Sequence, residues 1–397
     1  MEQKYRIVYH EKGPKKGKID KIFHNDYNDF YFWNYEEQTK VKHKVLSEYL
    51  KVWFIKLGVG GNSKINYYDG FSGCGAYYDY IRDEIGWGSP VIARKVAIEN
   101  RRNTNCNFYF NEAEPNNLKN LKAVLDYNNI SSPNIVFTNE VFNDNINAFL
   151  DKLEKNPVPT FFMIDPYGID VDFSVIERIL KIPRTEILLN FMYNFFNRFI
   201  THQQSEDSIN KFFGCTDWQQ FRPLKGDMKE QELVNFYRER LKTMSKYVYQ
   251  YRLSFAEQDK TYYYLIHMTQ HIDGCSIMKD AFSSVNFGNV EFLGPKQPNP
   301  NQVGLIDLSE LAINSLKEDI YKKYQNNNAS YQDIVDEYID NSPYLKRQIK
   351  AALESMEGTY LKVIEKPQNT RKFQNGYIFH FFDEPVIEMK YDQIKLF

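Results

Sequence analysis

A glycine-rich stretch after a short apolar segment most constrains how this chain folds. Residues 65–75 read Ile-Asn-Tyr-Tyr-Asp-Gly-Phe-Ser-Gly-Cys-Gly, with glycines at Gly70, Gly73 and Gly75. Glycine lets the backbone turn sharply and lets a ligand approach the main chain, because no Cβ stands in the way. We therefore predict a strand over 65–69, followed by a ligand-binding loop that turns toward a helix.

The order of residues in this loop narrows the class of ligand. The loop has neither the lysine and hydroxyl of a phosphate-binding P-loop nor the G-x-G-x-x-G order of dinucleotide-binding proteins. An aspartate at the strand end and the order D-G-F-x-G-x-G suit a ligand with a ribose and a charged, phosphate-free tail, such as S-adenosylmethionine. A plain strand–turn–helix is the alternative, since glycine clusters often form simple turns. The candidate cofactor-binding residues of the loop are Asp69, Gly70, Phe71, Gly73, Cys74 and Gly75.

Composition limits the class of protein. The 397 residues suffice for two or three domains, and a hydrophobic fraction of 42% is enough for sizeable cores. Because no apolar run approaches the roughly 20 residues of a membrane span, we expect a soluble, cytoplasmic chain without membrane contact. The four cysteines lie far apart, so we expect no metal site. The formal net charge of -2 argues against a nucleic-acid-binding surface over the whole molecule but leaves a local basic patch open.

Short apolar segments alternate with helical ones through most of the chain. A helix over 37–57 precedes the first strand, and a helical insertion over about 204–246 is either a lid or an enlargement of the core. The predicted strands cover 65–69, 108–110, 135–137, 160–164 and 186–191, and an antiparallel hairpin covers 247–255 and 261–269. Such alternation is typical of a doubly wound α/β sheet. Five parallel strands closed by a hairpin outline the Rossmann-like sheet of a class I methyltransferase.

Polar side chains follow the ends of these strands. Glu112 is positioned to hold a ribose diol through two hydrogen bonds, with Glu114 as the alternative. Asn139 or Glu140, after the third strand, is the candidate for the edge of an adenine. Asp165 follows the fourth strand. Because ligands of doubly wound sheets lie beyond the carboxyl ends of the strands, we expect these residues to line one cleft.

A stretch rich in proline and asparagine at 295–300 divides the chain. We expect an N-terminal arm and leading helix over 1–60, an α/β domain over 61–294 and a further domain over 301–397. The arm includes a lysine-rich run at 12–21, either solvated or in contact with phosphate. Before the second helix of the α/β domain, Ser89 is expected to serve as N-cap and Pro90 as the first helical residue.

The last domain is expected to contain three helices and a β-hairpin, which together look like a winged helix. Ser330 and Asp333 have the spacing of a capping box for the second of these helices. In DNA-binding versions the third helix enters the major groove and the wing contacts phosphate. Many winged helices bind only proteins, so DNA, RNA and protein partners all stay open. The residues that nucleic-acid binding would use are Lys346, Arg347, Lys350, Arg371 and Lys372.

Several short motifs follow one another in a characteristic order between about residues 40 and 290. They are Lys42-His43-Lys44-Val45-Leu46, Tyr68 through Gly75, Gly88-Ser89-Pro90, Asp165-Pro166-Tyr167-Gly168, Asn190-Phe191 through Arg198, Phe213-Gly214 and Tyr264-Leu265-Ile266. This order and spacing resemble the three-Cys-motif partner protein family (TcmP). The resemblance implies a class I S-adenosylmethionine-dependent methyltransferase-like fold. It also implies a partner protein with a three-cysteine motif, similar to radical-S-adenosylmethionine proteins, but no particular substrate.

The segment after the fourth strand has a more distant likeness, to the ribosomal-RNA adenine-N6 methyltransferases. Those enzymes carry D-P-P-Y, in which the acidic residue and a proline carbonyl accept hydrogen bonds from the target amino group and the aromatic ring stacks on an extruded base. This chain has Asp165-Pro166-Tyr167-Gly168, so the second proline is missing and the tyrosine comes one place early. The likeness implies that Asp165, Pro166 and Tyr167 are catalytic candidates, with the aromatic ring displaced.

Two classes of function follow. The first is an S-adenosylmethionine-dependent methyltransferase that acts on nucleic acid, at an amino group of a base, with the C-terminal domain holding the substrate. The second is a catalytically inactive partner or regulatory subunit that keeps the fold and binds the cofactor, nucleic acid or both. A nuclease is disfavoured, because no clustered Asp, Glu and Lys residues form a metal motif.

Overall fold

A computed structural model provides the fold of the chain. The described residues are 4–9, 19–24, 29–57, 64–79, 81–100, 105–255, 260–285, 290–293, 310–370 and 372–386. The chain forms two compact units, residues 1–297 and residues 298–397. Within the described ranges, no helix combines the length and the apolar character needed to cross a lipid bilayer.

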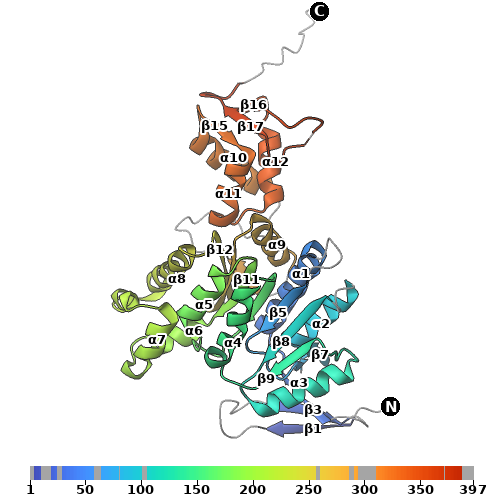
Figure 1. The fold of residues 1–397 in the computed structure, drawn as a ribbon. Coiled ribbons are helices and arrows are strands. Elements are labelled where there is room, and N and C mark those ends of the chain that lie inside the picture. Colours follow the sequence, from blue (N-terminus) through green and yellow to red (C-terminus); the bar gives the residue numbers. More distant parts are fainter. Residues whose placement is uncertain are drawn as a thin grey trace, which may run out of the picture. The chain divides into compact units, whose positions relative to one another are not determined.

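The first unit is built on one large mixed sheet (Figure 1). Its eight strands lie in the order β14-β12-β13-β11-β10-β5-β8-β9. They are β5 (Ile65–Asp69), β8 (Cys106–Asn111), β9 (Ile135–Thr138), β10 (Thr160–Ile164), β11 (Thr185–Phe191), β12 (Tyr247–Phe255), β13 (Lys260–Thr269) and β14 (Val290–Leu293). The strands β9, β8, β5, β10 and β11 are mutually parallel, whereas β13, β12 and β14 continue the sheet by antiparallel pairing. The predicted five parallel strands and antiparallel hairpin are confirmed, and β14 adds one strand beyond them.

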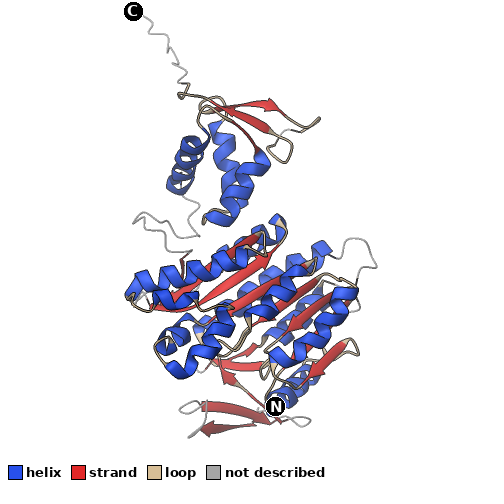
Figure 2. Cartoon of the chain, turned by 60° about the vertical axis from the view of Figure 1, so that its left-hand side comes forward, coloured by secondary structure: helices blue, strands red, loops and turns tan. Residues whose placement is uncertain are grey.

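Helices pack along this sheet and connect its strands (Figure 2). They are α1 (Glu37–Leu57), α2 (Ser89–Glu99), α3 (Pro115–Tyr127), α4 (Phe142–Lys155), α5 (Phe173–Lys181), α6 (Tyr193–Phe199), α7 (Glu206–Phe213), α8 (Gly226–Lys242) and α9 (Ile272–Ser283), with 3-10 turns η1 (Gln203–Ser205) and η2 (Asp217–Phe221). The predicted leading helix and the helical insertion are both present. The insertion starts earlier than predicted, because α6 follows β11 almost directly.

Aromatic side chains fill the core on both faces of the sheet. Successive residues of a strand point to opposite faces. On one face Tyr67 stacks on Phe161 at 6.0 Å between ring centroids, and the ring of Tyr49 from α1 lies 5.3 Å from Phe161. On the other face Tyr68 lies 4.8 Å from Phe149 of α4. Both faces of the central strands are therefore covered, which explains why β5 and β10 are buried along their whole length.

Two small sheets depart from the predictions for the N-terminal part. Strands β1 (Lys4–Tyr9), β2 (Ile19–His24) and β3 (Asp29–Tyr31) form an antiparallel sheet where an arm was expected. Strand β4 (Trp33–Asn34) pairs with β6 (Ala76–Asp79), so this segment is part of the first unit and no separate arm. Of the lysine-rich run, residues 12–18 lie outside the described residues.

The segment after the glycine-rich loop also differs from its prediction. The chain does not enter a helix directly, because β6 and β7 (Glu84–Trp87) first form a hairpin. The N-cap of α2 is Gly88, which has no side chain to cap the helix, and Ser89 is the first helical residue. The prediction that Ser89 is the N-cap is therefore wrong by one position. Its hydroxyl instead hydrogen-bonds the carboxylate of Asp69.

The second unit contains three helices and a three-stranded sheet of order β15-β17-β16. Its elements are α10 (Glu310–Tyr324), β15 (Asn328–Ser330), α11 (Tyr331–Asn341), α12 (Lys346–Met356), β16 (Leu361–Glu365) and β17 (Ile378–Phe381). The capping box is confirmed, since the Asp333 N–H donates to the Ser330 hydroxyl at 3.1 Å and the Ser330 N–H donates to the Asp333 carboxylate at 3.4 Å. The short strand β15, which pairs with β17, was not predicted.

Candidate functional site

Two carboxylates mark the point at which the strand order of the large sheet reverses. From β5 the chain proceeds outward through β8 and β9, and it then returns to β10 on the other side of β5. Asp69 ends β5, and Asp165 directly follows β10. In open α/β sheets the ligand-binding crevice lies outside the carboxyl ends of the strands at this reversal. The strand order therefore places both residues where a ligand is expected.

The glycine-rich loop is held firmly between β8 and β10. The Gly70 N–H donates to the Met163 carbonyl at 3.0 Å, and the Ser72 N–H donates to the Asn111 carbonyl at 2.9 Å. Gly73 has a φ of 63°, a left-handed conformation that favours glycine. A Cβ on Gly73 would also lie 3.0 Å from the ring of Trp33. The loop is thus a fixed turn, and the ring of Trp33 packs against its main chain at Gly73.

Glu112 ties this loop to the start of α3. Its carboxylate accepts the Gly73 N–H at 2.8 Å, the Glu114 N–H at 2.9 Å and the Asn117 side-chain amide at 3.2 Å. The side chain of Glu112 is half-buried. The alternative candidate, Glu114, is the N-cap of α3 and accepts the Asn116 N–H at 3.4 Å. Because Glu114 is used for capping, Glu112 is the better placed of the two for a ligand.

The two candidates after β9 have different surroundings. The side-chain amide of Asn139 donates to the carbonyls of Glu112 at 2.6 Å and Ala113 at 3.0 Å, so it braces the segment that presents Glu112. Glu140 is exposed, and its carbonyl accepts the side-chain amide of Asn111 at 3.0 Å. The structure therefore brings Asn139 and Glu140 to the strand end beside Glu112, as predicted.

Asn111 is a residue that the sequence analysis did not select. It is buried, and its side-chain amide also donates to the Gly70 carbonyl at 3.2 Å. Its side-chain oxygen accepts the Thr138 hydroxyl at 2.9 Å and the Asn145 amide at 3.0 Å. Asn111 thus joins the glycine-rich loop to the ends of β8 and β9. Its position as a polar residue at the end of a buried strand is the sequence signal that could have identified Asn111.

Asp69 is fully buried, and burial disfavours the ionised form of its carboxyl group. Burial raises its pKa to about 7, and the neighbouring charge of Asp165 adds to the increase. Hydrogen bonds from the Tyr67 hydroxyl at 3.2 Å and the Phe71 N–H at 3.4 Å act in the opposite direction. Ionisation of Asp69 is therefore poised near neutral pH.

Asp69 should make stability depend on pH in a defined direction. Because its folded-state pKa lies above its ordinary value of 3.8, its stabilising contribution is complete below about pH 4 and is lost as pH rises through about 7. We expect the free energy of unfolding of the wild type, relative to Asp69→Asn, to fall by about 1 kcal/mol between pH 6 and pH 8. Urea denaturation of both proteins at the two pH values measures this difference, and an unchanged difference would contradict the assignment.

Asp165 is oriented by two donors that come from distant parts of the chain. Its carboxylate accepts the side-chain amide of Asn190 at 2.6 Å and forms an ion pair with the ammonium of Lys42. The side chain of Lys42 is only 9% exposed, and its ammonium lies 5.8 Å from the ring centroid of Tyr263. Asn190 and Lys42 entered the sequence analysis only within motifs of the family resemblance, because nothing local shows that either meets Asp165.

The two residues after Asp165 differ in their exposure to solvent. Pro166 is buried, whereas the side chain of Tyr167 is 70% exposed. The ring of Tyr167 lies 6.4 Å from that of Phe195 on α6.

Two further candidates belong to the glycine-rich loop. The ring of Phe71 is half-buried, with its centroid 5.0 Å from that of Phe142. The buried thiol of Cys74 donates to the Ala76 carbonyl at 3.1 Å. The thiol of Cys74 is therefore used within the fold.

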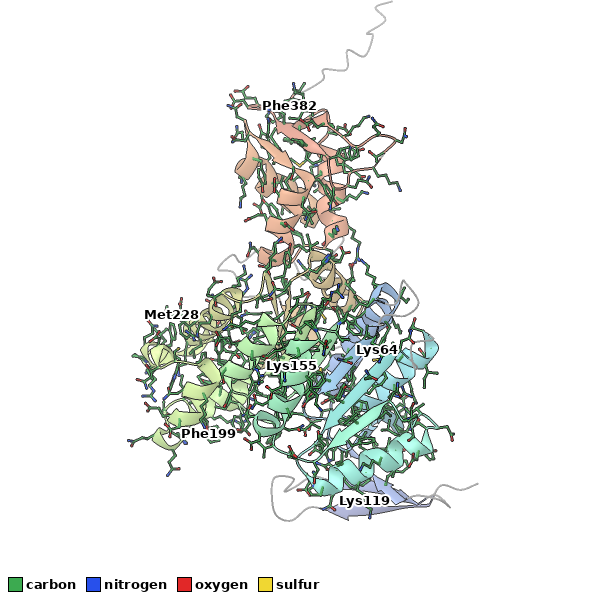
Figure 3. All side chains as sticks on the ribbon, viewed as in Figure 1. Lys64, Lys119, Lys155, Phe199, Met228 and Phe382 are labelled. Atoms are coloured by element: carbon green, nitrogen blue, oxygen red, sulfur yellow. The ribbon has the colours of Figure 1, made fainter. Side chains whose placement is uncertain are left out.

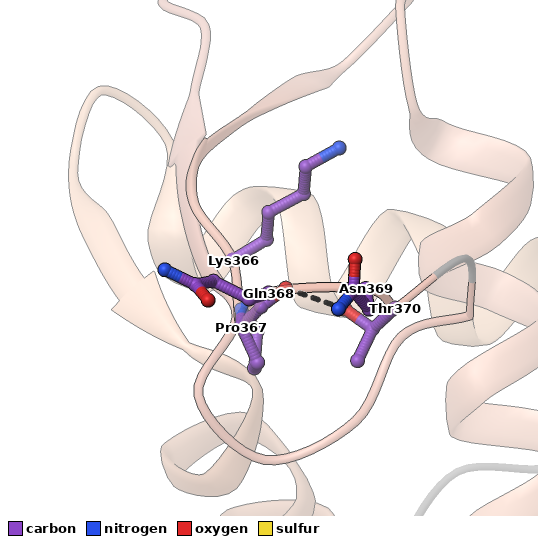
Figure 4. Close-up of a pocket in the computed structure, with 5 residues that line it drawn as sticks. All are labelled: Lys366, Pro367, Gln368, Asn369 and Thr370. Carbon is purple, nitrogen blue, oxygen red and sulfur yellow. Dashed lines mark hydrogen bonds between the residues drawn. The ribbon is translucent and has the colours of Figure 1, made fainter.

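The basic residues of the second unit lie on α12 and after β16. Lys346 and Lys350 are one helical turn apart, and Arg347 is exposed. Lys372 is exposed, and Arg371 lies outside the described residues. Between β16 and β17 a loop encloses a shallow pocket lined by Lys366, Pro367, Gln368, Asn369 and Thr370 (Figure 4). The Thr370 hydroxyl donates to the Pro367 carbonyl at 2.9 Å and closes this loop.

Comparison with known proteins gives only distant similarities. No protein-family model matches the chain, and no curated protein matches it in sequence. A solved protein of Legionella pneumophila of family DUF519 is 12% identical over 64% of this chain and 95% of its own, with a TM-score of 0.38. Spermidine synthase of Thermotoga maritima is 10% identical over 68% and 76%, with a TM-score of 0.35. Magnesium protoporphyrin IX methyltransferase of Synechocystis, solved with bound SAH, is 9% identical over 58% and 84%, with a TM-score of 0.27. Similarities this weak carry no assignment of function.

Proposed function

We propose that this chain is a class I methyltransferase that binds S-adenosylmethionine across the carboxyl ends of β5, β8 and β10. One observation carries the proposal. Asp69, the fixed glycine-rich loop, Glu112 and Asp165 all lie at the reversal of a sheet with five parallel strands and an antiparallel hairpin. That sheet is the outline of a class I methyltransferase, and the reversal is where such a sheet binds its ligand.

Each part of the site has a role in cofactor binding. The glycine-rich loop, fixed by the left-handed turn at Gly73, would hold the methionine portion. Glu112 accepts three protein hydrogen bonds, and a carboxylate has about four lone-pair sites. A ribose hydroxyl can take the remaining site or replace the Gly73 N–H. Asn139 and Glu140 stand at the next strand end, where the adenine edge would lie.

The protein's own contribution to methyl transfer is mainly alignment. When bound, the sulfonium of the cofactor supplies an activated methyl group, so little acid–base chemistry is needed. Asp165 would accept a hydrogen bond from an acceptor amine and hold its nitrogen in line with the methyl carbon. The proton that the amine loses on methylation would pass to solvent. Asn190 fixes the carboxylate orientation through its 2.6 Å hydrogen bond.

Nucleic acid is the proposed substrate class, with the amino group of a base as acceptor. Support comes from the second unit, which contains three helices and a β-hairpin, the elements of a winged helix. Lys346, Arg347 and Lys350 on α12, with Lys372 and Arg371 near the hairpin, would contact DNA or RNA. A partner protein with a three-cysteine motif is the companion that the family resemblance proposes.

A second candidate function rests on the ion pair of Asp165. The ammonium of Lys42 occupies hydrogen-bonding capacity that an acceptor amine would need. Tyr167 is also 70% exposed and so does not form a closed aromatic wall beside Asp165. A regulatory subunit that binds the cofactor without transferring its methyl group would keep both features. Cofactor binding alone does not separate this candidate from the enzyme.

Transfer of a labelled methyl group separates the two candidates. The full chain is incubated with methyl-labelled S-adenosylmethionine and with single-stranded or duplex DNA and RNA, each with and without the Lys42→Met substitution. The enzyme assignment predicts label on at least one wild-type nucleic-acid sample. Label only with Lys42→Met would show that the lysine blocks the acceptor position. Cofactor binding without transfer in any sample would favour the regulatory subunit.

A further inference from the structure

A row of aromatic side chains leads from the Asp165 loop along the outer face of α6. The ring centroids of Tyr167 and Phe195 are 6.4 Å apart, those of Phe195 and Phe199 are 4.6 Å apart, and those of Phe199 and His202 are 5.5 Å apart. Figure 3 shows Phe199 at the periphery of the first unit. We call Tyr167, Phe195, Phe199 and His202 the aromatic row.

The spacing of residues in α6 distinguishes its core-facing side from the flank that carries the row. Tyr193, Phe196 and Ile200 follow helical spacing and are buried, with Phe196 and Ile200 fully so. Phe195 and Phe199, four residues apart, are only half-buried and share the flank of the helix beside that buried face, where Phe195 also packs against the core. Tyr167 is 70% exposed, and His202 is exposed. Four rings in a row on an outer face mark a surface with a binding role.

The aromatic row is joined rigidly to Asp165. Gly168 has a φ of 112°, and a Cβ at this position would lie 3.1 Å from the ring of Phe195. The missing side chain therefore lets Phe195 pack against the loop that carries Asp165. Asn190, whose amide binds Asp165, also contacts the Met192 sulfur at 3.4 Å, directly before α6. Asp165 and the aromatic row are thus parts of one local structure.

We propose that the aromatic row binds the unpaired bases of a single-stranded nucleic acid and leads the strand to Asp165. This inference rests on the proposed function and specifies its substrate as single-stranded. Aromatic rings stack on any base, so a row of them binds a strand with little sequence preference. The row thereby supplies the aromatic surface that the order Asp165-Pro166-Tyr167-Gly168 displaces from the acceptor position.

The charge of the surface favours bases over the phosphate backbone. The sequence of α6 has one basic residue, Arg198, which is exposed beside Phe199. Duplex DNA presents mainly phosphate to such a surface, and its bases are already stacked on one another. A single strand, in contrast, offers free base faces. Binding by the row should therefore depend only weakly on salt concentration.

Fluorescence anisotropy with end-labelled 12-nucleotide strands tests the proposal. Lys346→Ala/Arg347→Ala serves as the background, so that α12 contributes little to binding. In this background we compare Tyr167→Ala, Phe199→Leu and Phe199→Trp, with single-stranded DNA, single-stranded RNA and the matching duplexes. Tyr127→Leu is the matched control, since Tyr127 is an exposed aromatic residue of α3, 40% accessible. All proteins are also titrated with S-adenosylmethionine.

We expect single strands to bind more tightly than duplexes. Phe199→Leu and Tyr167→Ala should each weaken single-strand binding by about 5- to 100-fold, the range for loss of one stacked base. Phe199→Trp should retain binding, and Tyr127→Leu should change it less than about twofold. DNA and RNA strands bound alike would indicate readout of bases rather than sugars, and a preference for one would identify the natural strand.

Two results would overturn the inference while leaving cofactor binding intact. The first is equal single-strand affinity for Phe199→Leu and its background. The second is no strand binding together with a self-association that Phe199→Leu abolishes, which would make the row a protein interface. Failure of the wild type to bind S-adenosylmethionine, with strand binding retained, would instead overturn the proposed function.

Discussion

Replacing Asp165 with alanine is expected to reduce methyl transfer by about 100-fold, the loss typical of a reacting group that is no longer held in line. The carboxylate stands directly after β10 and is fixed by Asn190 at 2.6 Å and by the ion pair with Lys42. Without it, the acceptor amine loses the carboxylate that would accept its hydrogen bond. Cofactor affinity should change by less than about fivefold, because the proposed cofactor contacts lie on β5, β8 and β9. Transfer of labelled methyl groups and calorimetric titration measure the two effects separately.

The loss of charge needs its own control. Asp165→Ala leaves the nearly buried Lys42 ammonium without its carboxylate, which by itself lowers stability. Asp165→Asn keeps the shape of the side chain and an oxygen that can accept from Asn190. Thermal denaturation of both variants reports the structural cost. If Asp165→Ala transferred methyl groups at the wild-type rate, Asp165 would have no role in orienting the acceptor.

Replacing Gly73 with aspartate is expected to weaken binding of S-adenosylmethionine by at least about 100-fold. The left-handed φ of 63° disfavours any side chain, and the new Cβ would lie 3.0 Å from the ring of Trp33. The added carboxylate would also stand beside Glu112, whose oxygen accepts the Gly73 N–H at 2.8 Å. A second negative charge here opposes both the ribose contact and the carboxylate of the methionine portion. Calorimetric titration of the folded variant measures the loss.

Gly226→Asp is the matched control for this substitution. Gly226 also has a positive φ, of 55°, but a Cβ there meets nothing within 4 Å. The Gly226→Asp substitution therefore introduces the same residue and comparable backbone strain at a position far along the sequence from the glycine-rich loop. We expect cofactor affinity within about twofold of the wild type. Equal weakening by both substitutions would show that the effect of Gly73→Asp is general strain rather than loss of a binding loop.

The large sheet was predictable because local sequence determines its strands. Residues 65–69 are β-prone and end in an aspartate, residues 160–164 are nearly all apolar, and the structure places β5 and β10 over the same residues. Such runs are the signal of strands buried on both faces. The N-terminal sheet and the β6–β7 hairpin were missed, because their strands mix charged and aromatic residues and depend on pairing with distant segments.

Only the carboxylates of the candidate site could be predicted from the sequence, and not the side chains that orient them. Asp69, Glu112 and Asp165 follow predicted strands, so their common position follows from the topology alone. The positions of the side chains that orient these carboxylates do not follow from the topology. Lys42 is 123 residues from Asp165 and Asn190 is 25 residues from it, and neither pairing has a local pattern. The flank of α6 that carries Phe195 and Phe199 was also missed, since a helix of seven residues is too short for its faces to be assigned from spacing.

Calorimetric titration of the wild-type chain with S-adenosylmethionine, and with S-adenosylhomocysteine beside it, tests the central claim most directly. The proposed site predicts saturable binding of one molecule per chain for both ligands. A well-folded chain that binds neither ligand, alone or with single-stranded nucleic acid present, would contradict the assignment of a cofactor site at the ends of β5, β8 and β10.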